Sequence, residues 1–401
     1  MKILFLISLL LGTQVLFGQV NDSEQTQYKN TAELMLEENT GLAIGGYGEV
    51  HYNQPLNSGR FNPGTLDAHR LVMFLGYNFS SKTQFVSEIE FEYAKEVWVE
   101  QMFLQQKINK YINLRAGILL IPMGIINEYH EPVTFNGVER PVIDNKIAPS
   151  TWREIGAGIS GNILQLKSKY QLYVVNGLNG YDAAGGVFSG SKTLREGRQK
   201  GSKAYITSPS YTGKVEFYGA KNLNIGISGY AGKSQSRLYT NLDKSNTALV
   251  QQADSSVVGI AMLGLDARYT FKGIRLTGQF YQISISNTEQ YNRFTTKNGM
   301  LNDLGSALQG YYAEIGYNVF RTLPGVKSEL MPFARYEAYN THHSVDGLTV
   351  ANKKYDNVII TTGLTYALTK GAVLKADLQF IKSEADTEFS KVFNAGFGIM
   401  F

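Results

Sequence analysis

The chain contains no cysteine, which excludes a disulfide framework and a lipid anchor on a terminal cysteine. Beyond its first residues it has no apolar run of roughly 18 residues, the minimum for a transmembrane helix. The formal net charge of +4 is small for 401 residues and gives no indication of a nucleic-acid partner. By contrast, 41 glycines, 25 tyrosines and 21 phenylalanines indicate many glycine-punctuated strands with aromatic ends.

The N-terminus has the pattern of a secretory signal peptide. Lys2 is followed by an almost wholly apolar run, Ile3–Phe17, and then by the small residue Gly18 and a polar sequence. We expect a signal peptide at 1–18 with cleavage after Gly18. Residues 19–40 are polar, with a short helix expected at 31–38, and we place this segment in the periplasm.

From residue 41 onward the apolar residues recur with period two, which indicates β-strands with one apolar and one polar face. Leu263, Leu265 and Ala267, for example, share one face, and Asp266 and Arg268 share the other. A mean hydropathy of −0.18 fits such alternation and does not exclude a membrane protein. Sixteen segments are predicted: 42–52, 70–79, 85–93, 97–108, 112–120, 154–163, 169–175, 214–220, 222–230, 257–271, 274–285, 308–320, 328–339, 357–368, 373–382 and 391–401.

The connectors between these segments alternate between short turns and mostly long loops. An even strand number with short turns on one rim and long loops on the other is typical of bacterial outer-membrane barrels. Lipid cannot hydrogen-bond to an exposed backbone, so only a sheet closed on itself can cross a membrane with strands. A soluble β-sandwich would show the same alternation, but not this loop pattern at this size. We therefore predict an all-β, antiparallel transmembrane barrel at 41–401, with long extracellular loops and short periplasmic turns.

The longest irregular stretch lies between the fifth and sixth predicted strands, at Ile121–Arg153. It carries four of the nine prolines and lacks strand and helix periodicity. Loops of this length are uncommon unless they are functional or disordered, and its aromatic and apolar content argues against disorder. We expect this third loop to fold into the barrel and narrow it.

Residues 99–161 resemble the porin family that includes the phosphate-selective O and P porins. The resemblance rests on Arg115-Ala-Gly117 at a strand end, on the corner Ile121-Pro-Met-Gly124, and on the long third loop that follows. The chain also ends in Phe401, which resembles the assembly signal of outer-membrane porins. The resemblance implies an outer-membrane pore that is commonly trimeric, is inserted by the barrel assembly machinery, and has its third loop at the constriction.

Charged residues of the third loop and of the inward faces are the candidate functional residues, because opposed charges filter solutes by size and field. The wall charges are mixed in sign and predict no cationic ladder, whereas a basic run in the fourth long loop could funnel anions or touch lipopolysaccharide phosphates. The candidate constriction is Glu128, His130, Glu131, Glu139, Arg140, Asp144, Lys146 and Arg153, with several of these paired to each other. The candidate lumen wall is Arg70, Glu88, Glu90, Arg115, Asp266, Arg268, Arg275, Arg335, Glu337 and Lys375. The candidate anion funnel is Lys192, Arg195, Arg198, Lys200 and Lys203.

Other kinds of site are disfavoured. Glu128, His130 and Glu131 are too loosely spaced to predict a metal site, and no cofactor is expected. The glycine-containing stretch 186–193 lacks phosphate-loop spacing, and the five histidines accompany no serine-nucleophile motif, so no enzyme is predicted. The sequence predicts a porin in outer-membrane lipid for small hydrophilic solutes and ions, including anions such as phosphate, and the family resemblance implies a homotrimer. A barrel with a closed lumen that docks partners is the leading alternative, and a barrel enzyme ranks third.

Overall fold

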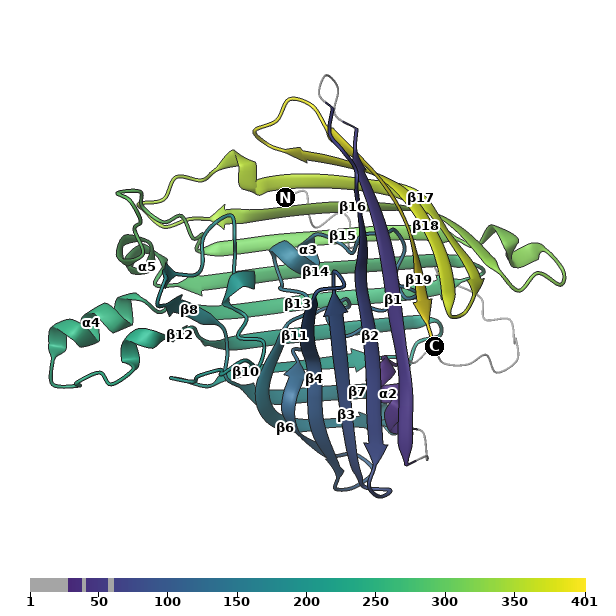
Figure 1. Cartoon of the computed structure of the whole chain (residues 1–401), viewed down its shortest axis with the longest axis horizontal. Helices are drawn as coiled ribbons and strands as arrows, with labels where there is room; N and C mark the ends of the chain where they lie inside the picture. The colour runs from purple at the N-terminus through teal and green to yellow at the C-terminus, as the bar shows by residue number, and fades with distance from the viewer. Residues whose placement is uncertain (1–27, 38–40, 57–60) are drawn as a thin grey trace.

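The computed structural model describes residues 28–37, 41–56 and 61–401, so the predicted signal peptide and its cleavage position lie outside the described residues. Sixteen strands form one closed antiparallel barrel, in which β1 pairs with both β2 and β19 (Figure 1). The C-terminal residue completes this closure, because Phe401 and Gly46 exchange two backbone hydrogen bonds of 2.9 Å. The predicted all-β barrel and its strand number are confirmed.

The observed strands match the predicted segments to within a few residues at most ends. The barrel strands are β1 Leu42–Pro55, β2 Thr65–Asn78, β3 Thr83–Glu92, β4 Glu96–Lys107, β5 Asn113–Leu120, β6 Arg153–Ile163, β7 Ser168–Val175, β10 Ser210–Phe217, β11 Leu223–Lys233, β13 Gly259–Phe271, β14 Ile274–Ser286, β15 Ala307–Tyr317, β16 Glu329–Ser344, β17 Asp356–Thr369, β18 Ala372–Ser383 and β19 Ser390–Met400.

The connectors contain the remaining elements. The helices are α2 Thr31–Glu37, α3 Ile143–Lys146, α4 Thr247–Ser255 and α5 Thr288–Phe294, and short strands β8 Asn179–Asp182, β9 Gly185–Gly186 and β12 Gln235–Ser236 form a small sheet between loops. The 3₁₀ turns are Leu164–Leu166, Arg195–Gly197, Arg237–Tyr239, Val319–Thr322 and Lys353–Tyr355. No helix in the described part of the chain is long and apolar enough to cross a membrane.

Alternation along the strands sorts the side chains as predicted. On β13, Leu263 and Leu265 are 45% and 41% exposed on the outside, whereas Asp266 and Arg268 on the inside are buried. On β2, the outward Leu71, Met73 and Leu75 are likewise exposed. The barrel therefore carries its apolar residues outward and its charges inward, the reverse of a soluble protein.

Short and long connectors alternate along most of the barrel, and the clearest departures are two links. The link between β3 and β4, 93–95, is a tight turn on the long-loop side, and the link between β15 and β16, 318–328, is long on the short-turn side. Helices α4 and α5 extend beyond the strands at the long-loop end, and α3 lies inside the ring of strands (Figure 1). As the sequence indicates, most long connectors therefore lie at one end of the barrel and most short turns lie at the other.

The third loop, 121–152, does not lie over the surface but fills the barrel interior. The largest hydrophobic cluster joins Ile121, Met123, Ile143 and Trp152 of this loop to wall residues of many strands. The Pro-x-Gly corner is required for this approach, because a Cβ on Gly124 would lie 1.8 Å from the Tyr281 hydroxyl oxygen, and its φ of 67° is unfavourable for other residues. The prediction that the loop folds inward holds, although Arg153 already begins β6.

Candidate functional site

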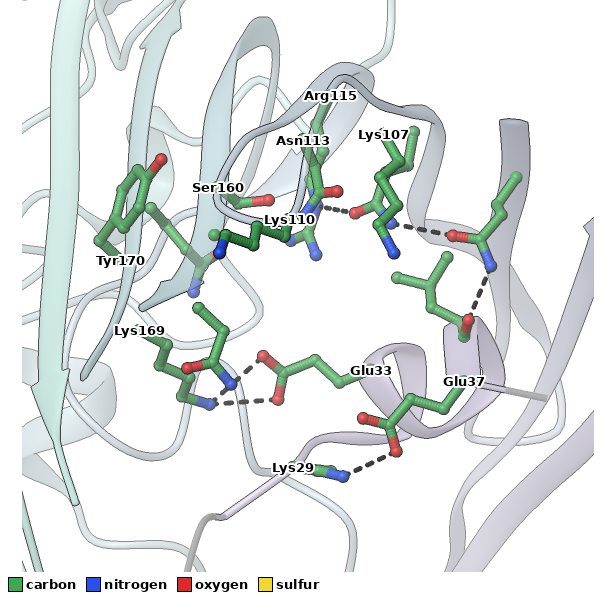
Figure 2. A pocket seen from close by; sticks show the side chains of 16 residues that line it. Lys29, Glu33, Glu37, Lys107, Lys110, Asn113, Arg115, Ser160, Lys169 and Tyr170 are labelled. Carbon is green, nitrogen blue, oxygen red and sulfur yellow. Dashed lines mark hydrogen bonds and ion pairs between the residues drawn. The ribbon is translucent and has the colours of Figure 1, made fainter. Parts of the chain in front are cut away.

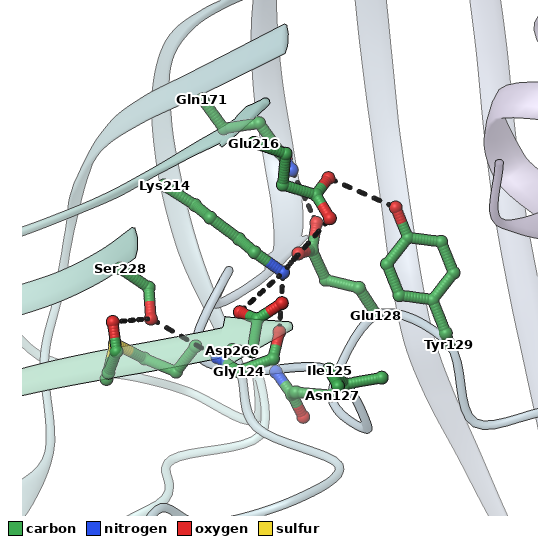
Figure 3. Close-up of polar contacts among 12 residues, drawn as sticks. Gly124, Ile125, Asn127, Glu128, Tyr129, Gln171, Lys214, Glu216, Ser228 and Asp266 are labelled. Atoms are coloured by element: carbon green, nitrogen blue, oxygen red, sulfur yellow. Dashed lines mark hydrogen bonds and ion pairs between the residues drawn. The ribbon is translucent and has the colours of Figure 1, made fainter. Parts of the chain in front are cut away.

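The first half of the third loop is fastened to the wall by Lys214 of β10. Its Nζ donates to the Gly124 carbonyl at 2.6 Å and to a carboxylate oxygen of Glu128 at 3.0 Å, as Figure 3 shows. Glu216 and Asp266 of the wall lie 3.5 Å and 3.6 Å from the same nitrogen. Lys214 is thus a buried cation shared by three carboxylates, and we call these four residues the lysine node. Gln171 also donates to Glu128, so the loop cannot leave the wall here without exposing unpaired charges.

A second attachment joins His130 of the loop to two strands on the other side. Its Nε2 lies 3.1 Å from a Glu100 oxygen on β4 and 3.4 Å from a Glu88 oxygen on β3, and all three side chains are buried. Burial alone would lower the pKa of His130, but Glu100 and Glu88 outweigh it and raise the pKa to about 10. The imidazolium therefore bridges two carboxylates. We call these three residues the histidine node.

The histidine node also has the spacing of a metal site, since one ligand atom from each residue lies within 4.8 Å of the others. The set differs from the one weighed in the sequence. Glu128 belongs to the lysine node, and Glu131 accepts hydrogen bonds from the backbone and hydroxyl of Thr31, so the two do not join His130. In this structure the three side chains contact one another directly, as a histidine between two carboxylates.

The second half of the loop reaches the opposite wall through its own backbone. The amides of Val138 and Val142 donate to Asp377 of β18 and Glu337 of β16 at 2.7 Å and 2.6 Å. Asp144 accepts hydrogen bonds of 2.7 Å from Gln279 and Tyr281 of β14, and burial raises its pKa to about 7. Wall carboxylates here accept hydrogen bonds from the backbone amides of the loop.

Three of the predicted constriction residues keep partial solvent exposure: Glu139, Arg140 and Lys146. The Glu139 side chain is 32% exposed and accepts hydrogen bonds from Asn53 at 2.9 Å and His51 at 3.2 Å. Burial would raise the pKa of Glu139, but His51 outweighs it and holds the pKa at about 2. These three charges are the predicted constriction residues that solvent still reaches.

The other five predicted constriction residues are buried: Glu128, His130, Glu131, Asp144 and Arg153. Their described contacts are with wall strands, loop backbone and the N-terminal segment, so they hold the loop in place. Of the predicted wall residues, Arg70, Glu88, Glu90, Asp266, Arg268, Arg335, Glu337 and Lys375 are also buried, and Arg115 is half-buried. Arg275 is exposed and forms a 2.5 Å ion pair with Glu329 at the short-turn end. A lining role for the predicted residues as a set remains a prediction.

The basic run of the fourth long loop folds back onto the third loop. Arg195 and Arg198 both donate to the Ser150 carbonyl, at 2.8 Å and 2.5 Å. Arg198 and Arg153 donate to the Thr151 carbonyl, and Arg153 and Lys200 lie over the Trp98 ring. We call the four cations, Arg153, Arg195, Arg198 and Lys200, the arginine cluster.

Among the residues that the structure describes, the arginine cluster forms no ion pair with a carboxylate. Burial and the neighbouring Arg195 and Arg153 lower the pKa of Arg198 to about 9. Burial likewise lowers the pKa values of Arg195 and Lys200. The remaining predicted funnel residues, Lys192 and Lys203, are exposed. The cluster therefore concentrates positive charge without a carboxylate partner beside residues 150 and 151 of the third loop.

The helix α2 belongs to the segment 19–40 that is predicted from the sequence to lie in the periplasm, and it is a further part of the site. Its predicted extent is confirmed to within one residue, but it packs against β2 and β3 inside the short-turn end. Gln84 donates to the Leu36 carbonyl at 2.6 Å, and Lys169 of β7 lies 3.1 Å from Glu33. Because α2 also binds the third loop through Thr31, both fill the barrel together.

Comparisons with solved structures place the fold among the porins. An anion-selective porin from Comamonas acidovorans superposes with a TM-score of 0.57 at 12% identity, over 90% of this chain and 99% of that one. OmpF of Salmonella typhi, solved in complex with daunomycin, gives 0.53 at 11% identity, over 90% and 97%. These likenesses show a shared sixteen-strand barrel architecture.

No model of a known protein family matches the chain. A protein of Aquifex aeolicus (strain VF5), described as uncharacterized, is 33% identical over 352 residues, which are 84% of this chain and 75% of that protein. Sequence identity at this level over most of both chains shows that the two proteins are related. The chain therefore belongs to the same family as this Aquifex aeolicus protein.

Proposed function

We propose that the protein is a bacterial outer-membrane porin that allows passive diffusion of small hydrophilic solutes and ions. The observation that carries this proposal is the sorting of side chains, with exposed apolar residues around the outside of a closed barrel and charges within it. Only a lipid surrounding makes that arrangement favourable for a single chain of this size. The porin fold of the structural neighbours supports the same function.

The path through the barrel is narrow under this proposal. The third loop and α2 occupy much of the interior, and solvent still reaches Glu139, Arg140 and Lys146 of the loop. A solute must therefore pass close to charged side chains, which sets its rate by radius and charge. We expect a lower conductance than that of a barrel whose wall residues face open water.

Anion preference is the finer part of the proposal, and phosphate is one candidate anion. The arginine cluster supports it, because uncompensated cations at a mouth raise the local anion concentration. The resemblance of Arg115–Gly124 to the phosphate-selective porins also supports a preference for anions. Reversal potential under a salt gradient tests it, and block of the current by phosphate but not by sulfate would identify phosphate as the preferred anion.

A closed barrel that docks partners is the second candidate, and it is favoured by the burial of most predicted wall residues. Single-channel recording in a planar bilayer separates the two functions. The porin proposal expects discrete open steps from protein whose folding is verified by its heat-dependent migration in gels. Folded protein that inserts but gives no steps would support the closed barrel instead.

The cellular setting is part of the proposal. We expect an outer-membrane homotrimer, delivered by the signal peptide 1–18 and inserted by the barrel assembly machinery through Phe401. Lipopolysaccharide would contact the long loops and lipid the apolar belt. Membrane fractionation and chemical cross-linking of the native membrane test these expectations.

A further inference from the structure

The short-turn end of the barrel contains a cavity of about 290 Å³ between α2 and the wall. Its wall side is built by β4, β5 and β6, and α2 faces them across the opening (Figure 2). The volume lies at the lower end of the range for small-molecule sites, so its occupant would be about the size of a monosaccharide. The candidate constriction residues do not line this cavity.

Strand register places the polar groups of the wall side in two rows. Gln105 pairs with Arg115 in one row, and Lys107, Asn113 and Ser160 pair in the next. Period-two alternation points all five side chains to the same inward face. Figure 2 shows Lys107, Asn113 and Arg115 together on this side of the cavity.

Several of these groups have no partner among the described residues. Ser160 is 3% exposed, and its hydroxyl makes no hydrogen bond. Arg115 donates through Nε to Gln105 and through Nη1 to Tyr173, which leaves Nη2 free. The Asn113 amide and the Lys107 ammonium are likewise unpaired there. Ser160 is the buried member of this set, and a buried hydroxyl without a partner can bond to a ligand that enters the cavity, while the other three groups offer donors beside it.

The charge balance of the cavity favours an anion. Each carboxylate of α2 in the lining already has a cation, since Glu37 lies 2.7 Å from Lys29 and Glu33 lies 3.1 Å from Lys169. The remaining cations of the lining are Lys107, Lys110 and Arg115, and among the described lining residues no further carboxylate opposes them. Lys107 and Arg115 can hold an anionic group, while Asn113 and Ser160 offer donors and acceptors to hydroxyls.

We propose that this cavity binds a small sugar anion, a sugar phosphate or a sugar acid, held by Lys107, Asn113, Arg115 and Ser160. The charged group lies between Lys107 and Arg115, and the sugar hydroxyls face Asn113 and Ser160. The site does not depend on an open channel, because it is formed by α2 and the inner wall. It goes beyond the porin function, in which no solute is held.

Isothermal titration calorimetry on the full-length protein in detergent tests the proposal, with glucose 6-phosphate and gluconate as probes. We expect saturable binding of at least one of the two sugar anions, and affinities at least about tenfold lower for glucose and for inorganic phosphate. Absence of saturable heat with both sugar anions would overturn the site. Inorganic phosphate binding as tightly as the sugar anions would overturn the sugar part of the assignment.

Substitutions locate the binding. Arg115→Gln and Lys107→Gln should each weaken the sugar anion about tenfold, and Ser160→Ala should weaken it about fivefold. Lys221→Gln is the matched control, because it removes an exposed lysine from another short turn. Equal weakening by the control would show that general charge, not this cavity, binds the anion. Since no bilayer is used, a missing channel current would leave this result unaffected.

Discussion

The lysine and histidine nodes and the arginine cluster both place basic side chains inside the protein, but they partner them differently. In the nodes, Lys214 and His130 are each surrounded by carboxylates, so their charges are neutralised and hold the third loop to the wall. In the arginine cluster, cations such as Arg198 contact carbonyl oxygens and leave their charge uncompensated. A charge inside the barrel is therefore structural where it is paired, and is available to solutes where it is not.

Replacing Lys214 should have the largest effect. Lys214→Met leaves Glu128, Glu216 and Asp266 facing each other without their shared cation. Breaking a buried ion pair in this way costs about 3–5 kcal/mol. Denaturant unfolding in detergent, followed by tryptophan fluorescence, measures the loss, since Trp152 ends the third loop.

Two comparisons make the Lys214→Met result specific. Lys221→Met, in an exposed turn, should change stability by less than about 0.5 kcal/mol. If the loop detaches, single-channel conductance should also rise above that of the wild type. A variant as stable as wild type would show that the lysine node does not hold the loop.

The histidine node should make stability depend on pH. His130 has a pKa of about 10 in the folded protein, above its unfolded value of about 6.5. Its contribution is therefore fully present below about pH 6.5 and is lost as pH rises through about 10. Between pH 7 and 9 we expect the free energy of unfolding to fall by about 1–3 kcal/mol, and His130→Gln should flatten this slope.

Comparing the wild type with His130→Gln isolates the His130 contribution, because other buried groups also titrate in or near this window. Asp144, with a folded pKa of about 7, loses its contribution mainly below this window, as pH rises from about 4 to 7. Arg198, with its pKa lowered to about 9, adds stability only as pH rises above that value. An unchanged slope in His130→Gln would assign the titration to another group.

The arginine cluster should affect selectivity more than stability. The double variant Arg195→Gln, Arg198→Gln removes two uncompensated charges and should reduce the anion-to-cation permeability ratio about fivefold. Reversal potential under a potassium chloride gradient measures the ratio. The exposed pair Lys192→Gln, Lys203→Gln removes the same charge and should change the ratio less, because solvent screens it. If both double variants change the permeability ratio equally, the position of the arginine cluster does not determine the anion preference.

The sequence pattern predicted the barrel, but it did not predict these long-range ion pairs. The outward positions of Leu263 and Leu265 could be predicted from the local alternation of apolar and polar residues. The third loop could be predicted because residues 121–153 lack that alternation. The partners of Lys214 and His130 depend on the position of the third loop inside the closed barrel. No local sequence pattern encodes that position. Glu100 was not singled out, since a buried carboxylate looks like any inward-facing one until His130 reaches it. Arg198 lay in a basic run typical of a solvated loop, and only tertiary packing buries it.

The weakest attachment is that of α2, and it gives the smallest expected effect. Glu33→Gln removes one partner of Lys169, which keeps Glu216 at 2.9 Å, so the loss should be about 1 kcal/mol or less. Hydrogen–deuterium exchange should become faster in α2 and stay unchanged in the third loop, whose nodes are intact. Glu37→Gln, on a more exposed pair with Lys29, should change exchange even less. Faster exchange in both α2 and the third loop would mean that α2, and not only the two nodes, holds the loop in the barrel.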